Sequence, residues 1–223
     1  MVPIIVRLSS ALPALLLFLM PSSTCAGDVK RPQRMTASFQ SGVNGYNGTV
    51  DIEVWALAPT TILDTNPNAT SDANNDGGES QVLLRFERIV GNGPGQIPPG
   101  SAIRSATLFV SAFDQGDTVH IHRMLVPWQR QATWSTLVAG VTADGTEASR
   151  HRESFTFGKI AANSSLIPFD VTDSVQAWVK GTANFGWVFI NTGGNGWDFY
   201  TCEFDDVKQR PKLVVEYSVP SSH

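Results

Sequence analysis

The sequence carries little charge and has no excess of basic side chains. Charged residues make up 16% of its 223 positions, well under the roughly 25% of an ordinary globular domain. Sixteen Lys and Arg stand against 20 Asp and Glu, which gives a formal net charge of −4. Because binding to a phosphate backbone depends on positive side chains, this balance argues against a nucleic acid as the partner.

Long apolar runs are also missing, apart from one near the start. The run from Ala11 to Met20 follows a single basic residue, Arg7, and leads into small residues that end at Ala26. This order is typical of a secretory signal peptide, and the run is shorter than the about 20 apolar residues that cross a bilayer. We predict a signal peptide over residues 1–26, and therefore a secreted, extracellular protein with no membrane attachment after cleavage.

Cysteine is scarce. The chain has two cysteines, Cys25 and Cys202, and the predicted cleavage removes the first of them. A lone thiol cannot form a disulfide within its own domain. The stability of the mature protein must then come from a packed core or from a bound metal.

The sequence is rich in short apolar segments that turn residues separate, with 19 Gly and 13 Pro. In the last of these segments Leu213, Val215 and Tyr217 alternate with polar residues, which is the period of a pleated strand. The pattern predicts an all-β fold, a jelly-roll-like β-sandwich of about nine or ten strands. The other candidate strands lie at Phe39 and at residues 50–55, 81–87, 102–113, 118–126, 166–171, 186–192 and 197–204.

One segment has helical spacing instead. Val171, Val175 and Trp178 recur at the period of a helix. Thr172 is a suitable cap for its first turn, and Gly181 is suited to the left-handed conformation that ends a helix. We predict one short helix here. The absence of a linker or an internal repeat favours a single domain over residues 36–219.

Four blocks of sequence stand out together, at residues 39–49, at 81–86 with 95–98, at 122–134, and at 169–172 and 176–178 with 210–213. In their order and spacing they resemble the DNRLRE domain, which is grouped with the carbohydrate-binding modules of family 96. The resemblance implies a secreted β-sandwich that binds a polysaccharide. The best-known ligands of that family are acidic polymers such as alginate, held by basic side chains.

Four residues are candidates for ligand binding. Arg85 and Arg123 lie in the resembling blocks, and an arginine can hold a carboxylate through two hydrogen bonds. A structural ion pair is the alternative for each. Trp128 and Trp197 lie near turns, where an indole ring can pack against the face of a sugar; burial in the core is their alternative.

Two groups of residues are candidate metal ligands. Asp72, Asn74 and Asp76, followed by Gly77, have the spacing of the first half of a calcium loop, although no acidic residue stands where such a loop ends. A solvated turn is the alternative, and Ca²⁺ is the one cofactor that the sequence suggests. His120 and His122 lie two apart on a predicted strand and share a face, which suits a zinc or copper ion as well as an ordinary surface.

No catalytic signature of hydrolases, metalloproteases or phosphate-binding enzymes is present in the sequence. We therefore expect a non-catalytic polysaccharide-binding module and not an enzyme. Two alternatives stay open: an extracellular structural or adhesion domain that calcium stabilises, and a polysaccharide lyase or hydrolase. The sequence leaves the polymer, a partner enzyme and the oligomeric state undetermined.

Overall fold

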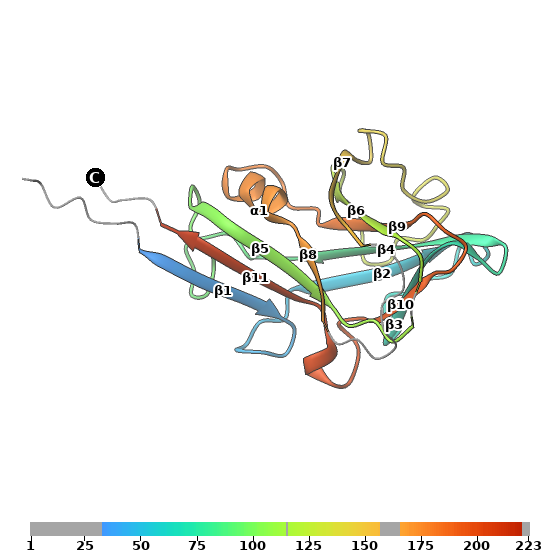
Figure 1. The fold of residues 1–223 in the computed structure, drawn as a ribbon, viewed down its shortest axis with the longest axis horizontal. Coiled ribbons are helices and arrows are strands. Elements are labelled where there is room, and N and C mark those ends of the chain that lie inside the picture. Colours follow the sequence, from blue (N-terminus) through green and yellow to red (C-terminus); the bar gives the residue numbers. More distant parts are fainter. Residues whose placement is uncertain (1–32, 115, 157–165, 220–223) are drawn as a thin grey trace, which may run out of the picture. The chain divides into compact units, whose positions relative to one another are not determined.

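Two antiparallel β-sheets pack against each other in the computed structural model, which describes residues 33–114, 116–156 and 166–219 (Figure 1). The predicted all-β sandwich is confirmed. The predicted signal peptide, residues 1–26, lies outside the described residues.

The smaller sheet has four strands in the order β1-β11-β5-β8. Its edge strand β1 pairs with β11 from Arg34↔Ser218 to Gln40↔Lys212. In Figure 1 these two strands reach well beyond the left-hand ends of β2 and β4 in the other sheet. The four strands are β1 (Arg34–Gln40), β5 (Ala102–Val110), β8 (Ile167–Asp170) and β11 (Lys212–Ser218).

The larger sheet has seven strands. Six of them follow the order β10-β3-β4-β9-β6-β7, and β2 lies outside this order and pairs with β4 from Thr49↔Phe86 to Trp55↔Ser80. The described residues thus hold eleven strands, against the nine or ten expected. The sequence pattern missed β3 and β7 because both are rich in polar residues and lack apolar alternation. The seven strands are β2 (Thr49–Trp55), β3 (Asn68–Asn75), β4 (Gly78–Phe86), β6 (Val119–Met124), β7 (Ala148–Phe155), β9 (Trp187–Asn191) and β10 (Trp197–Tyr200).

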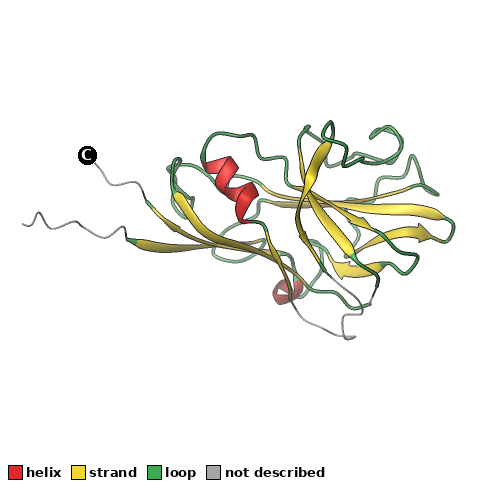
Figure 2. Cartoon of the chain, turned by 45° about the horizontal axis from the view of Figure 1, so that its top comes forward, coloured by secondary structure: helices red, strands yellow, loops and turns green. Residues whose placement is uncertain are grey.

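The main apolar core lies between the two sheets. Leu108 and Val215 of the small sheet are fully buried there, as are Leu84 and Phe189 of the large sheet. The helix α1 (Thr172–Val179) closes one end of this core, where the rings of Trp178 and Trp187 lie 4.9 Å apart. Figure 2 shows how little helix accompanies the strands: α1 and the short 3₁₀ helix η1 (Val207–Gln209).

The ends of α1 confirm one prediction and correct another. Gly181 has the expected left-handed conformation, with φ of 104°, and its N–H donates to the carbonyl of Trp178 at 3.0 Å. Thr172, however, is the first helical residue and not the cap, which is Val171. The Thr172 hydroxyl donates to Asp170 Oδ1 at 2.6 Å and accepts the N–H of Ala106 at 2.9 Å. The hydroxyl therefore links the start of the helix to Asp170 of β8 and to Ala106 of β5.

A second apolar cluster covers the outer face of the large sheet. The long connection between β6 and β7, residues 125–147, packs Trp128 and Val141 against Ile52, Leu83 and Val188. The indole N–H of Trp128 donates to the carbonyl of Phe185 at 2.7 Å. The large sheet is thus buried on both faces, which is why successive residues of its central strands are apolar.

The backbone at Gly186 has no room for a side chain. Its φ is +72°, and an added Cβ would lie 2.2 Å from the carbonyl oxygen of Leu84. We expect Gly186→Ala to lower the free energy of unfolding by about 3 kcal/mol, because a strained backbone adds to a contact with main-chain atoms that cannot move freely. Urea unfolding measures the change. Gly194→Ala is the matched control, since no atom lies within 4 Å of its added Cβ, and an equal effect of both changes would contradict the argument.

Candidate functional site

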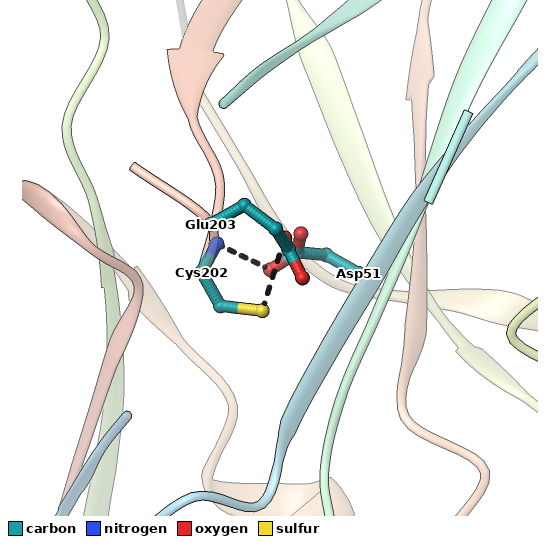
Figure 3. Close-up of side chains that lie close together, drawn as sticks. All are labelled: Asp51, Cys202 and Glu203. Carbon is teal, nitrogen blue, oxygen red and sulfur yellow. Dashed lines mark hydrogen bonds between the residues drawn. The ribbon is translucent and has the colours of Figure 1, made fainter. Parts of the chain in front are cut away.

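Two carboxylates and a thiol meet at the inner side of β2. Asp51 lies on β2, and Cys202 and Glu203 lie in the turn after β10; Figure 3 shows all three side chains directed toward one another. The backbone N–H of Cys202 donates to Asp51 Oδ2 at 3.0 Å, and the Cys202 thiol donates to Glu203 Oε2 at 3.2 Å. We call this group the acid–thiol pocket.

Strand alternation explains why an acid is buried here. Val50, Ile52 and Val54 belong to the outer apolar cluster, so the residues between them point to the opposite side of the sheet. Asp51 is only 1% exposed and Glu53 8% exposed. Glu53 accepts the N–H of Thr70 at 3.0 Å.

Arg130 supplies the positive charge beside the pocket. Its Nε donates to Asp64 Oδ2 at 3.1 Å, and its Nη2 donates to Glu203 Oε1. Glu203 therefore turns one oxygen toward Arg130 and the other toward Cys202. Asp51 Oδ1 has no hydrogen-bond partner among the described residues, although it is buried.

The electrostatics of the pocket disfavour a second negative charge. Burial, with the nearby Glu203 carboxylate, raises the pKa of Asp51 to about 8. Burial also raises the pKa of Glu53 to about 7, against the opposing effect of the Thr70 N–H. The pKa of the Cys202 thiol is raised by burial and by the carboxylates of Asp51 and Glu203. The pocket is therefore suited to hold a proton or a positive ion.

The acid–thiol pocket also has the spacing of a metal site. One ligand atom from each of Asp51, Cys202 and Glu203 lies within 4.8 Å of the others, and within the described ranges no other three His, Cys, Asp or Glu residues are grouped this closely. The sequence carries no signal for this group, because Asp51 and Cys202 are 151 positions apart and come together only in the folded chain.

The predicted calcium ligands lie on a hairpin and not on a long loop. Asp72 and Asn74 belong to β3, and the chain turns into β4 at Asp76 and Gly77, whose φ angles are +53° and +97°. Asp72 Oδ1 accepts the N–H of Asn74 at 2.9 Å. Binding of calcium by these residues stays a prediction.

The predicted ligand-binding residues lie mostly inside the protein. Arg85 stacks on the ring of Trp128, 4.1 Å from its centroid, and binds Glu87 at 2.8 Å. Trp128 is 5% exposed and Trp197 is fully buried, so neither indole offers an open face to a sugar. The Nε atom of Arg123 is buried without a hydrogen-bond partner in the described part of the chain. Arg85 and Arg123 are partly exposed, and ligand binding by these four residues stays a prediction.

His120 and His122 do share one face of β6, as expected from their spacing, with ring centroids 6.1 Å apart. His122 Nδ1 lies 2.8 Å from the carbonyl oxygen of Ser149, and His120 Nε2 lies 3.1 Å from an amino group of Arg152. Burial lowers the pKa of both histidines, and the charge of Arg152 lowers it further. A metal at this pair stays a prediction.

A groove of about 800 Å³ lies beside the edge strand β1. We call it the β1 groove. Its lining includes Tyr46, which is partly buried, Tyr217, which is 5% exposed, and Arg88, whose side chain is 65% exposed. The remaining lining residues are Met35, Thr36, Ala37, Ser38, Phe39, Val43, Asn44, Gly45, Asn47, Gly93, Pro94, Gly95 and Gln96.

The lining of the β1 groove is held in place by local contacts. The Tyr46 hydroxyl donates to the carbonyl of Glu87 at 3.0 Å, and its ring meets Phe39 edge-on at 5.3 Å. Asn44 and Arg88 both have positive φ angles, +50° and +56°. Such strained residues persist only where the surrounding structure fixes them, and they cluster at functional sites.

Comparison with known proteins does not identify the chain: no protein-family model and no curated protein matches it. The resemblance to the DNRLRE domain therefore stays a prediction. Among the described residues, no helix is both long and apolar enough to span a membrane.

The buried acids predict a stability that falls as pH rises. The unfolded chain releases the protons of Asp51 and Glu53 near pH 4, whereas the folded protein holds them until their pKa values of about 8 and 7. The free energy of unfolding should then decrease from about pH 5 to about pH 8. Urea unfolding in the presence of a chelator measures this slope.

The double change Asp51→Asn with Glu53→Gln should flatten that slope, because neither amide titrates. Asp76→Asn, a change at the exposed hairpin turn, serves as the control and should leave the slope as in the wild type. A slope that survives the double change would show that other groups cause it.

Proposed function

We propose that the protein is a secreted, non-catalytic module that binds a polysaccharide in the β1 groove. The observation that carries the proposal is the composition of that groove. The partly exposed ring of Tyr46 lies in the lining together with the guanidinium of Arg88 and the amides of Asn44, Asn47 and Gln96. Sugars present C–H groups on their ring faces and hydroxyls around their edges, and this lining complements both. The resemblance to carbohydrate-binding modules supports the same function.

The size of the β1 groove fits a few sugar units of a longer chain. Its volume of about 800 Å³ lies within the roughly 300–1,000 Å³ of ordinary ligand sites. The strand β1 pairs with β11 along one edge, and within the described residues its other edge has no strand partner. Its free backbone groups can therefore add hydrogen bonds to sugar hydroxyls.

Arg88 favours a polymer that carries carboxylates. Its guanidinium lies 3.8 Å from Glu87 Oε2, which is a loose contact, so the group can turn to an incoming anion. Local charge and not net charge guides a ligand onto a surface. An acidic polysaccharide is thus compatible with the overall negative charge of the chain.

The lining of the groove favours binding over turnover. It contains no His, Cys, Asp or Glu. Tyr46 is a possible base for a lyase, but its hydroxyl is engaged with the carbonyl of Glu87, and burial raises the pKa of Tyr46. A phenolate at this position is therefore disfavoured at neutral pH.

Arg88→Gln tests the proposal. We expect it to weaken binding to alginate or polygalacturonate by about tenfold or more, since it removes a charge-assisted hydrogen bond. Glutamine, like arginine, carries a Cβ, so the strain of the positive φ at residue 88 is the same in the variant. Affinity electrophoresis and calorimetry measure the change. Asn47 also lines the groove, and Asn47→Ala should weaken binding to xylan or cellulose as well if neutral polymers are bound.

Arg104→Gln is the matched control. Arg104 is an exposed arginine on β5 and is not part of the groove, so this change removes the same charge elsewhere and should leave binding unchanged. Failure of the wild type to bind any of the four polymers, or equal losses in both arginine variants, would count against the β1 groove as a glycan site.

A further inference from the structure

The acid–thiol pocket has no part in the proposed glycan binding, yet its composition calls for a ligand of its own. We propose that Asp51, Cys202 and Glu203 bind one divalent metal ion of the kind that accepts both thiolate and carboxylate ligands, such as Zn²⁺. This proposal stands independently of the proposed function.

The geometry suits a small ion with few ligands. Zinc takes Cys sulfur and carboxylate oxygen at about 2.0–2.3 Å, with four ligands in a tetrahedron. The three ligand atoms of the pocket already lie within 4.8 Å of one another, so rotations of the side chains bring them to one centre. The carbonyl oxygen of Thr49, 3.5 Å from Cys202 Sγ, is placed to serve as the fourth ligand or to hold a bound water.

An unpartnered buried oxygen points to the same conclusion independently of the spacing. Asp51 is 1% exposed, and its Oδ1 atom has no hydrogen-bond donor among the described residues. Figure 3 shows this carboxylate directed toward Cys202 and Glu203. A buried carboxylate oxygen without a partner is costly unless a cation or a proton satisfies it.

The local balance of charge favours a cation. Asp51, Asp64 and Glu203 supply three carboxylates, and Arg130 is the guanidinium that contacts two of them. Arg130 binds Oε1 of Glu203 and leaves Oε2 facing the thiol. A divalent ion between Asp51 and Glu203 compensates the charge that Arg130 does not reach.

The bound ion would act as a crosslink. It would join β2 to the turn after β10, between residues that are 151 positions apart, where the described residues hold no disulfide. Because the unfolded chain does not present the site, the free energy of metal binding adds to the stability of the fold.

The experiment uses the full mature chain without an affinity tag, freed of metal with a chelator. Calorimetric titration with ZnCl₂ should show one ion per chain and raise the melting temperature. Titration with CdCl₂ should produce the ultraviolet absorption of a thiolate–cadmium bond, which reports on the sulfur ligand directly. Cys202→Ser should abolish this absorption, and Asp51→Asn should weaken Zn²⁺ binding by at least about tenfold.

Two controls separate this site from the others. His122→Ala disrupts the histidine pair on β6, and Asp72→Asn alters the β3–β4 hairpin; both should bind Zn²⁺ as the wild type does. Circular dichroism establishes that each variant is folded. If Asp51→Asn does not fold, the cadmium absorption of the wild type and its loss in Cys202→Ser still decide the matter.

Three results would overturn the proposal. The first is an absence of Zn²⁺ binding by the wild type, which would leave a shared proton as the partner of Asp51 and Glu203. The second is Zn²⁺ binding that His122→Ala abolishes. The third is a response to Ca²⁺ alone, without cadmium absorption, which would exclude the thiol as a ligand.

Discussion

Burial of the large sheet on both of its faces is the interaction on which the rest of the structure depends. One face meets the small sheet through residues such as Leu84 and Phe189, and the other meets residues 125–147 through Leu83 and Val188. Each large apolar side chain contributes about 1.5–3 kcal/mol when it is buried fully. Without a disulfide in the described residues, this double burial has to hold the domain together. It also explains why Trp128 lies inside: it belongs to the layer that covers the outer face.

The same double burial places charge where it is costly. Because Val50, Ile52 and Val54 of β2 are used to fill the outer cluster, Asp51 and Glu53 must face the other way. Asp51 is buried beside the turn after β10, and Glu53 is buried beside β3, where it accepts the N–H of Thr70. Desolvation raises the pKa of both carboxyls. Buried acids persist when a nearby positive charge compensates them. Arg130 compensates Asp64 and Glu203, which it contacts. The negative charge of Asp51 is left without a positive partner among the described residues, and this is the physical basis for the metal proposal.

The β1 groove arises from a different feature, the edge of the small sheet. Strands β1 and β11 extend beyond the large sheet (Figure 1), and the turns at residues 43–47 and 93–96 close the hollow beside them. Binding residues on turns that a rigid sheet positions are common in proteins. The connection from β1 to β2 carries Tyr46 into this groove and leads to Thr49, the first residue of β2, whose carbonyl oxygen lies 3.5 Å from Cys202 Sγ. Both candidate sites therefore depend on the placement of one short segment.

The sequence by itself determined the class of fold, the period of most strands, and the end of α1 at Gly181, because these depend on neighbouring residues and on local backbone preference. It did not determine β3 and β7, since polar strands give no apolar alternation and are defined by their partners. Nor did it separate a buried tryptophan from an exposed one: Trp128 and Trp197 look alike beside turns, and only packing between distant segments covers them. The two candidate sites were likewise decided by the tertiary structure. Asp51 meets Cys202, and Tyr46 and Arg88 line one groove, because the folded chain brings together residues whose spacing along the sequence carries no signal.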